Sequence, residues 1–395
     1  MVTHLPAPSW TARADLAALV AALGPDNLRW VGGAVRDTLL DQPVKDVDAA
    51  TPLRPDVVLE RLAAAGIRAV PTGIAHGTVT AVLPDGPVEV TTLRRDVATD
   101  GRHATIAFAS EWRDDAARRD FTINALYADP RTLEISDWFD GLPDLAARRV
   151  RFIGDPHQRI REDHLRILRY YRFQARFGAE LDAAAEAACA ELAPTLKGLS
   201  RERVAMELLN LLALPDPAAT LARMEAAGVL PIALPERSTG GVELLTQLIG
   251  WEQAHGMAPD PLRRLAALLP ADPRQVDQAA ARLRLSTAQR KRLAQAAKRQ
   301  SHDGDDPRAL AYRLGRAEAL DRLALTGGDP SAVAEWDMPV FPLKGGAIIA
   351  RGVSAGPDVA RLLRMVEDRW VASGFPNAEA TDALLDHVLA AHRGG

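Results

Sequence analysis

A chain of 395 residues is longer than one small hydrophobic core organises, so we expect two to four domains. Its hydrophobic content of 47% and charged content of 25% are typical of a soluble globular protein. A net charge of −4 argues against a basic coat over the whole surface, and the single cysteine excludes an internal disulfide.

No stretch approaches an uninterrupted apolar membrane span, and the N-terminus lacks the basic-then-apolar pattern of a signal peptide. The cysteine, Cys189, lies in the alanine-rich run 183–190, which favours a buried helical thiol over a nucleophile. We therefore expect a cytoplasmic protein with no membrane partner.

Basic residues gather in two segments of this otherwise acidic chain. Residues 148–176 contain nine arginines and three acids, and residues 282–299 contain seven basic residues and no acid. Local charge of this kind, rather than the net charge, decides whether a protein contacts nucleic acid.

The first predicted elements are a helix, a short strand and a two-glycine turn. Residues 11–23 repeat apolar side chains at helical spacing. The apolar run 28–31 then stops at Gly32 and Gly33, and helical turns follow over 34–40. Such a turn lets the backbone approach a phosphate and directs helix N–H groups at it. The alternative is an ordinary turn, which Gly-Gly before a helix usually forms.

The next predicted strand carries two carboxylates, Asp46 and Asp48. Residues two apart on a strand point to the same face, so both carboxylates reach one point in space. Hard oxygen ligands at this spacing suit Mg²⁺, and a metal beside a phosphate cradle favours nucleotidyl transfer. The alternative is a pair of acids on a solvated strand edge, which an isolated Asp-x-Asp usually is.

These two motifs, in this order, carry a family resemblance. Gly-Gly-Ala-Val-Arg-Asp at 32–37 and Lys-Asp-Val-Asp at 45–48 resemble the polymerase-β-like nucleotidyltransferases, in the class II branch of tRNA CCA-adding enzymes and bacterial poly(A) polymerases. The resemblance implies an α+β fold, with a head of a small mixed sheet and helices followed by an all-α neck, body and tail. We place the catalytic head at 1–140, the base-recognising neck at 141–200 and the tRNA-binding body and tail at 201–395.

The resemblance also implies roles for the residues of both motifs. Gly32, Gly33 and Arg36 would bind the nucleotide triphosphate. Asp46 and Asp48 would bind Mg²⁺, activate the terminal 3′-hydroxyl and steady the leaving pyrophosphate.

Three β-rich runs follow a predicted amphipathic helix at 54–65. They cover 67–71, 78–83 and 88–93, and Asp85-Gly86 is a hairpin signal between the last two.

Glu89 stands between two valines on the third of these runs. An acid at such a position is costly unless it has a partner. The alternative is an edge-strand glutamate that faces water. Beside the expected metal site we predict a third catalytic carboxylate near Asp46 and Asp48, and the resemblance implies the same role.

From Arg94 to Asp114 the sequence shows neither the alternation of a strand nor the periodicity of a helix. A long polar stretch inside a compact domain is usually functional or disordered. The resemblance implies a flexible loop that helps to switch nucleotide choice. His103 fits a catalytic base, although a lone loop histidine is more often only solvated.

Residues 118–126 join the charged pair Arg119 and Asp120 to an apolar anchor. Arginine can bind a triphosphate, and an adjacent aspartate can accept from a ribose hydroxyl. The alternative is an ion pair at a helix N-terminus. The longer run resembles the class II ribose-recognition motif, which implies these ribose and phosphate roles, and residues 137–145 resemble the hinge between head and neck.

Asp155-Pro156 is a strong helix start, and we expect one helix from there to Phe177. Four arginines fall within an arc of roughly 120° on this helix, namely Arg166, Arg169, Arg172 and Arg176. The alternative is a solvated face with intrahelical pairs such as Asp163 with Arg166. Four arginines with no acid among them repel one another, which favours an anionic partner.

Glu-Asp-His-Leu-Arg-Ile-Leu-Arg at 162–169 matches the class II motif E-D-x-x-R-x-x-R. The resemblance implies that Asp163 and Arg166 present hydrogen-bonding edges to cytosine or adenine. A carboxylate accepts from the amino group that C and A share, and a guanidinium donates to a ring nitrogen or carbonyl. By the same resemblance Arg169 serves the base and Arg172 the phosphates.

Beyond residue 200 the sequence pattern predicts helices. We expect the basic block 282–299 to form a phosphate-backbone surface, with a solvated helix face as the alternative. Residues 341–346 and 352–357 resemble the RNA-facing C-terminal segment of the family. His302-Asp303 is an isolated pair, and nothing near it suggests a phosphohydrolase domain.

The resemblance implies a template-independent tRNA nucleotidyltransferase that uses Mg²⁺, CTP and ATP to add C, C and A to the tRNA 3′ end. A bacterial poly(A) polymerase and a CC-only or A-only enzyme are the alternatives within the class. The long loop from Arg94 to Asp114 and its residues 100–104 look more like the CCA-adding side, and this loop disfavours a CC-only enzyme. A non-catalytic RNA-binding relative is disfavoured because the expected metal carboxylates and base-reading pair are intact. The sequence leaves the oligomeric state open.

Overall fold

The computed structural model describes residues 3–99 and 104–393. The chain forms two compact units, Met1–Pro235 and Glu236–Gly395. The boundaries expected at 140 and 200 both fall within the first unit, so the division into head and neck stays a prediction. His103 lies outside the described residues.

A seven-stranded mixed sheet organises the first unit, which confirms the predicted α+β head. The strand order is β3-β4-β5-β2-β1-β8-β9, with β2 and β5 parallel and the other neighbours antiparallel. The strands are β1 (Arg29–Val31), β2 (Val47–Thr51), β3 (Ala69–Gly73), β4 (Thr78–Ala81), β5 (Val88–Thr92), β8 (Tyr127–Ala128) and β9 (Ile135–Ser136). The three β-rich runs expected after the helix at 54–65 are therefore β3, β4 and β5.

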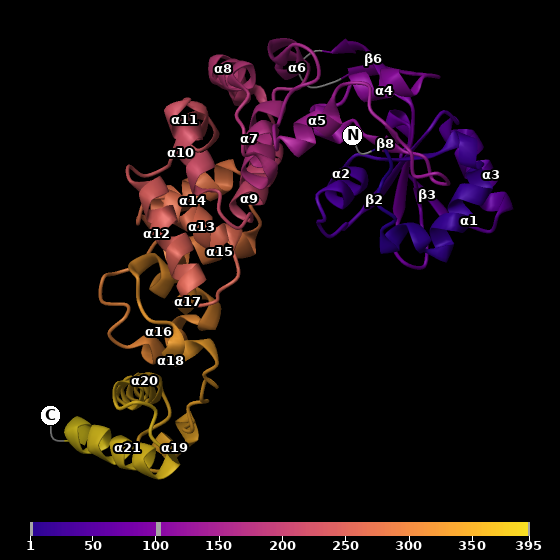
Figure 1. Cartoon of the computed structure of the whole chain (residues 1–395). Helices are drawn as coiled ribbons and strands as arrows, with labels where there is room; N and C mark the ends of the chain where they lie inside the picture. The colour runs from indigo at the N-terminus through magenta and orange to yellow at the C-terminus, as the bar shows by residue number, and fades with distance from the viewer. Residues whose placement is uncertain (1–2, 100–103, 394–395) are drawn as a thin grey trace. The chain divides into compact units, whose positions relative to one another are not determined.

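Two helices, α1 (Ala14–Leu23) and α3 (Pro55–Ala64), lie side by side next to the sheet (Figure 1). Leu16, Leu19 and Leu23 recur at helical spacing on α1 and are fully buried. This apolar stripe explains why the segment folds as a helix against the core.

The stretch from Arg94 to Asp114 contains regular structure, so the expectation of an irregular loop was wrong, while its expected role in nucleotide choice stays a prediction. A two-stranded antiparallel ribbon, β6 (Arg94–Thr99) and β7 (Ala104–Phe108), is followed by α4 (Trp112–Ala117). The polar composition hid the ribbon, because paired backbones can satisfy each other's hydrogen bonds without an apolar alternation.

The helix expected from residue 155 to 177 is interrupted, which corrects a second prediction. It divides into α6 (Pro156–Glu162) and α7 (Arg166–Phe177). Asp155 caps α6 as predicted, accepting from Gln158 N at 2.7 Å. Asp163 is extended, and its Oδ1 accepts from the backbone N of Leu165 at 3.1 Å. This local hydrogen bond competes with helix continuation.

In its described part the first unit contains six further α-helices, namely α2 (Gly33–Leu39), α5 (Gly141–Ala146), α8 (Ala183–Leu192), α9 (Arg201–Leu212), α10 (Ala218–Ala226) and α11 (Val229–Ala233). Of these, α9 and α10 pack against α7. Cys189 is buried on α8 as predicted, and burial raises the pKa of its thiol.

The second unit is helical in its described part. Its helices are α12 (Gly241–Ala254), α13 (Pro261–Leu268), α14 (Pro273–Arg282), α15 (Thr287–Ala296), α16 (Pro307–Leu314), α17 (Arg316–Thr326), α18 (Ser331–Ala334), α19 (Gly345–Ile349), α20 (Pro357–Ala372) and α21 (Ala378–Arg393). Over the ranges that the structure describes, no helix combines the length and apolar character needed to cross a membrane.

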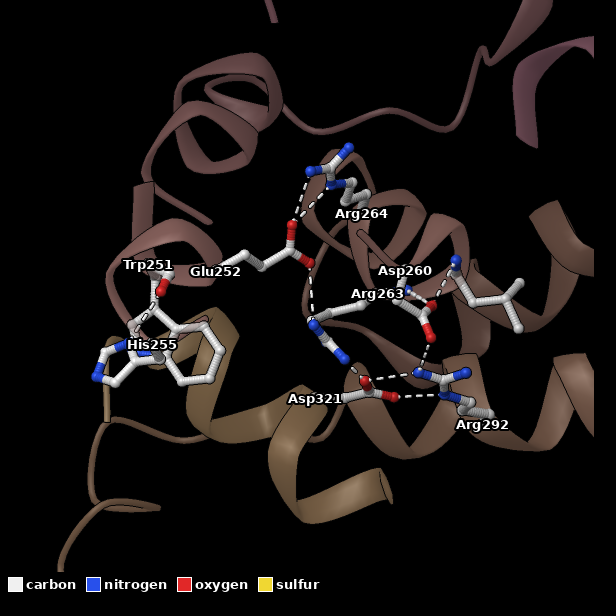
Figure 2. Close-up of polar contacts among 9 residues, drawn as sticks. Trp251, Glu252, His255, Asp260, Arg263, Arg264, Arg292 and Asp321 are labelled. Carbon is white, nitrogen blue, oxygen red and sulfur yellow. Dashed lines mark hydrogen bonds and ion pairs between the residues drawn. The ribbon is translucent and has the colours of Figure 1, made fainter. Parts of the chain in front are cut away.

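An ion network joins four helices of this unit (Figure 2). Glu252 of α12 accepts from Arg263 at 2.9 Å and from Arg264 at 2.8 Å. Asp321 of α17 accepts from Arg263 at 3.0 Å and from Arg292 of α15 at 2.6 Å. Both carboxylates are about 1% exposed, so the arginines supply the partners that buried acids require.

Candidate active site

Gly32 connects β1 to α2 in the predicted strand, glycine, helix order. Its φ of 68° with ψ of −120° is a conformation that essentially only glycine adopts. A Cβ at this position would lie 3.3 Å from Nη1 of Arg119 and 3.8 Å from the carbonyl oxygen of Asn124. The glycine therefore lets the Arg119 guanidinium approach the backbone of the turn, and Gly33 follows as the first residue of α2.

The three predicted carboxylates lie on or beside the parallel strands β2 and β5. Asp46 immediately precedes β2, Asp48 is the second residue of that strand and Glu89 is the second residue of β5. The register of the two strands sets Asp48 directly opposite Glu89. The fold therefore brings the third carboxylate beside the pair.

Crowding of negative charge perturbs Asp48. Burial, reinforced by the charge of Glu89 and more weakly by that of Asp46, raises the pKa of Asp48 to about 6, while Arg119 acts in the opposite direction. A neighbouring cation would stabilise the ionised form of Asp48 in this environment.

The donor set fits a hard divalent cation. In the described ranges, no three His, Cys, Asp or Glu side chains are arranged to hold one metal ion. A cation of the Mg²⁺ type needs no such cage, because one or two carboxylates bind it and waters and substrate phosphates complete its shell. Asp46 and Asp48 meet that requirement without Glu89.

Arg36 lies inside the fold and is only 4% exposed. It donates to Asp37 at 2.8 Å and to Oδ1 of Asn124 at 2.5 Å. Its guanidinium also lies 5.2 Å from the ring centroid of Phe173 and 4.5 Å from that of Phe177. These contacts tie α2 to α7, and the expected triphosphate contact of Arg36 stays a prediction.

Arg119 and Asp120 lie side by side in sequence but have different partners. Arg119 donates from Nε to the Tyr127 hydroxyl at 3.0 Å and pairs through Nη2 with Asp115 at 3.3 Å. Asp120 accepts two hydrogen bonds from Arg169, at 2.8 and 2.5 Å.

Asp120 is held in its ionised form. Burial would raise its pKa, but Arg169 and a hydrogen bond from Asn124 outweigh burial and lower the pKa of Asp120 to about 2. The pair is therefore a tertiary link between the ribose-motif segment and α7, not the helix N-terminal pair considered from the sequence.

Asp163 and Arg166, considered from the sequence as an alternative intrahelical pair, each pair with another residue. Asp163 pairs with Arg203 of α9 at 2.7 Å. Arg166 pairs with Glu162 at 2.6 Å and donates to the carbonyl oxygens of Arg159 at 2.9 Å and Arg118 at 3.1 Å. The extended backbone at Asp163 separates the two side chains from a common helical face.

The other three arginines of α7 also have acidic partners from distant elements. Arg169 pairs with Asp120, Arg172 with Glu207 at 2.6 Å, and Arg176 with Asp37 at 3.1 Å. Because the fold supplies an acid for each of these arginines, their mutual repulsion does not by itself require an anionic ligand.

Sequence reasoning missed the two residues of α9 that serve this face, Arg203 and Glu207. Glu207 is 2% exposed and lies on the buried face of an amphipathic helix, beside Val204, Leu208 and Leu211. A buried acid in such a helix requires a partner, and that signal was available in the sequence.

The second basic block is largely engaged in internal contacts. Arg282 forms a two-point pair with Glu236 at 2.6 and 2.7 Å, and Arg290 pairs with Asp277 at 2.8 Å. Arg292 belongs to the network of Figure 2, and Arg299 donates to backbone carbonyls. Much of the expected phosphate-binding surface is thus structural.

Two family descriptions match the chain. Residues 28–151 match "Poly A polymerase head domain", and residues 178–239 match "Probable RNA and SrmB- binding site of polymerase A". The first range contains the glycine turn and the carboxylates, and the second contains Arg203 and Glu207.

Two animal relatives match over most of their length, and a bacterial relative matches over less than half. The chain is 35% identical over 381 residues to CCA tRNA nucleotidyltransferase 1, mitochondrial, of Danio rerio, covering 91% of this chain and 86% of the relative. The Homo sapiens protein of the same name is 34% identical over 390 residues, covering 92% and 86%. A CCA-adding enzyme of Enterococcus faecalis is 40% identical over 185 residues, covering 46% and 44%.

Solved structures share the fold. The Bacillus stearothermophilus CCA-adding enzyme in complex with CTP superposes with a TM-score of 0.78 at 26% identity, covering 96% of this chain and 98% of that chain. The Thermotoga maritima CCA-adding enzyme complexed with tRNA superposes with a TM-score of 0.72 at 20% identity, covering 95% and 94%.

Proposed function

The chain belongs to the CCA tRNA nucleotidyltransferase family, and on this premise we propose that it adds C, C and A to the 3′ end of tRNA from CTP and ATP. The observation that carries the proposal is the placement of Asp48 opposite Glu89, with Arg119 close to both Asp48 and Gly32. The carboxylates that would attract a cation and the Arg119 guanidinium that would bind a triphosphate therefore lie close to the same turn at Gly32.

We propose Mg²⁺ as the cation and Asp46 and Asp48 as its protein ligands. A bound divalent cation supplies charge stabilisation to the transferring phosphoryl group. Glu89 adds to the negative charge around Asp48. Arg119 positions the triphosphate beside Gly32, where the missing side chain leaves room for close approach.

Asp163 and Arg166 are proposed to read the base. Asp163 keeps acceptor capacity while paired with Arg203, because a carboxylate has about four lone-pair sites. Arg166 donates three hydrogen bonds, one to Glu162 and two to backbone carbonyls, so about two of its five N–H groups remain available to a base. An acceptor beside a donor matches the edge that C and A share and repels the carbonyl of U or G.

The remaining proposed contacts are to ribose and phosphate. Asp120 faces the ribose and Arg172 the phosphates, while Arg169 supports Asp120 through their two hydrogen bonds. Because Asp120 and Arg172 already have ionic partners, nucleotide binding would add to these pairs or rearrange them.

The experiment supplies a tRNA transcript that lacks its 3′ end with each nucleotide and sequences the products. We expect two C residues, then one A, then arrest. A long A tail would support a poly(A) polymerase, and A added only to tRNA that already ends in CC would support an A-adding enzyme.

Base reading has its own test. Asp163→Ala should slow C and A addition by roughly 10- to 150-fold, the value of one hydrogen bond to a charged group. It should also weaken rejection of UTP and GTP, because the repulsive carboxylate is gone. Single-turnover incorporation of all four nucleotides measures both effects, and one common factor for all four would contradict base reading by Asp163.

We also propose a cytoplasmic location, supported by the single free cysteine. The animal relatives named above are mitochondrial proteins, so cell fractionation is the deciding measurement.

A further inference from the structure

Asp115 is a buried carboxylate on α4 that lies outside every motif assigned above. It is 1% exposed. Its neighbour Ala116 is buried in the same core cluster as Val31 of β1 and Tyr127 of β8. Packing of α4 against the sheet therefore fixes where the Asp115 carboxylate lies.

Both oxygens of Asp115 accept hydrogen bonds. Oδ1 accepts from the backbone N of Arg94 at 3.3 Å and from Nε of Arg118 at 2.8 Å. Oδ2 accepts from the Tyr127 hydroxyl at 2.6 Å and from Nη2 of Arg119 at 3.3 Å. One carboxylate thus links a ribbon strand, a sheet strand and the arginine expected at the triphosphate.

The Tyr127 hydroxyl gives Arg119 a second tie to Asp115. It accepts from Nε of Arg119 at 3.0 Å while it donates to Asp115. The guanidinium also lies 5.2 Å from the centroid of the Tyr127 ring. Tyr127 and Asp115 therefore fix Nε and Nη2 of Arg119 by hydrogen bonds. Nη1 lies near the Gly32 turn and has no hydrogen-bond partner among the residues that the structure places.

The bond to Arg94 extends this arrangement to the ribbon. Arg94 is the first residue of β6 and is opposite Phe108, the last residue of β7. The carboxylate that orients Arg119 therefore also holds the base of the β6–β7 ribbon.

Resting on the proposed function, we propose that Asp115 is a positioning residue that fixes Arg119 for the nucleotide triphosphate and ties it to the base of the β6–β7 ribbon. An arginine held in its binding geometry loses less side-chain freedom when the ligand arrives. Asp115 thus strengthens nucleotide binding without touching the nucleotide.

The test measures equilibrium binding of CTP and ATP to the full chain by calorimetry. Asp115→Asn should raise both Kd values roughly 10-fold, the low end of what one lost hydrogen bond to a charged group costs. The kcat at saturating nucleotide should fall less than kcat/KM. Tyr127→Phe, which keeps the ring and removes the hydroxyl, should act in the same direction.

Two controls separate positioning from general stability. Asp114→Asn removes the same charge one residue away on α4, where the side chain is exposed, and should leave both Kd values unchanged. In an Arg119→Ala background, Asp115→Asn should add no further loss, because a residue that acts through Arg119 has nothing left to position.

Hydrogen exchange reports the ribbon contact independently of activity. Asp115→Asn should speed exchange of the Arg94 amide, and Asp114→Asn should not. If Asp115→Asn fails to fold, Tyr127→Phe supplies the binding test.

The outcomes distinguish this proposal from the proposed function. A wild type that does not add C, C and A overturns the function. A wild type that does, with Kd unchanged in Asp115→Asn or with equal losses in both backgrounds, overturns the positioning role alone.

Discussion

At the scale of single residues, the acids of the site differ in how their charge is balanced. Asp115 and Asp120 each contact arginines, whereas the pKa of Asp48 is raised by burial and by other acids. The paired acids are suited to holding the fold in place. Asp48, with its excess negative charge, is suited to a cation.

Replacing Asp46 or Asp48 with Ala should therefore abolish nucleotide incorporation and leave tRNA binding nearly unchanged, because the proposed RNA contacts lie elsewhere. Incorporation with the divalent cation in excess, and filter retention of labelled tRNA, measure the two properties. Turnover retained in either variant would remove the two-carboxylate site.

Asp120→Asn should change stability in a pH-dependent way. The pKa of Asp120 in the folded protein is about 2, below its ordinary 3.8, so its ionised form stabilises the fold fully above pH 4 and progressively less toward pH 2. The variant should lose about 2 kcal/mol of unfolding free energy at pH 6 and about half of that at pH 3.

Urea unfolding of both proteins at the two pH values measures this difference. Asp26→Asn, which removes a carboxylate whose side chain is 80% exposed, should stay within about 0.5 kcal/mol of the wild type at either pH. An equal loss for Asp120→Asn at pH 6 and pH 3 would show that its pKa is not depressed.

At the scale of elements, the sequence was sufficient where the signal is local. The β-rich runs, the hairpin at Asp85-Gly86 and the Asp155 cap depend on neighbouring residues, and each was predicted. The break at Asp163 depends on one side chain that bonds the backbone two residues later, which helical periodicity does not reveal.

Ion pairs between residues far apart in the sequence were the part of the site that was harder to predict. The pairs of Asp163 with Arg203 and of Arg172 with Glu207 join residues 40 and 35 positions apart. A single sequence states the charge of each residue but not which opposite charge the fold brings to it. The roles of the predicted nucleotide-binding residues therefore stay predictions, while their positions are now known.

The stability of the second unit should depend on one buried acid, Asp321, which links helices α13 and α15 to α17. Asp321→Asn would remove the carboxylate that Arg263 and Arg292 share and leave each with one acid, Glu252 and Asp260 respectively (Figure 2). Removing one partner of a buried ion pair costs about 3–5 kcal/mol, so the second unit should unfold at lower denaturant.

Asp368→Asn is the matched control for that loss. It breaks a pair with Arg313 in which both side chains are more than half exposed, and it should cost less than about 1 kcal/mol. Equal midpoints for the two variants, measured by urea unfolding followed by circular dichroism, would contradict a structural role for the network.

At the scale of the whole molecule, the two compact units divide the predicted tasks unevenly. Every residue predicted to bind nucleotide or cation lies within Met1–Pro235. The tail segments that resemble the RNA-facing part of the family lie within Glu236–Gly395.

A fragment of residues 1–235 should accordingly fold and bind CTP and ATP with Kd values within roughly threefold of the full chain, a change below 1 kcal/mol. Its affinity for tRNA should fall more steeply. Thermal unfolding, nucleotide calorimetry and tRNA filter binding test the three statements, and a fragment that keeps full tRNA affinity would contradict the proposed role of the second unit.

The parallel pairing of β2 with β5 has a consequence for how sequences of this kind can diverge. Asp48 meets Glu89 only because the two strands are in register. Deletion of Val88, with the start of β5 held in place, would shift the rest of the strand by one residue and set Val90 against Asp48, without removing any acid from the sequence. The connection between β4 and β5 lies outside the pairing of β5 with β2, so inherited insertions should be more frequent in that connection than within the strand.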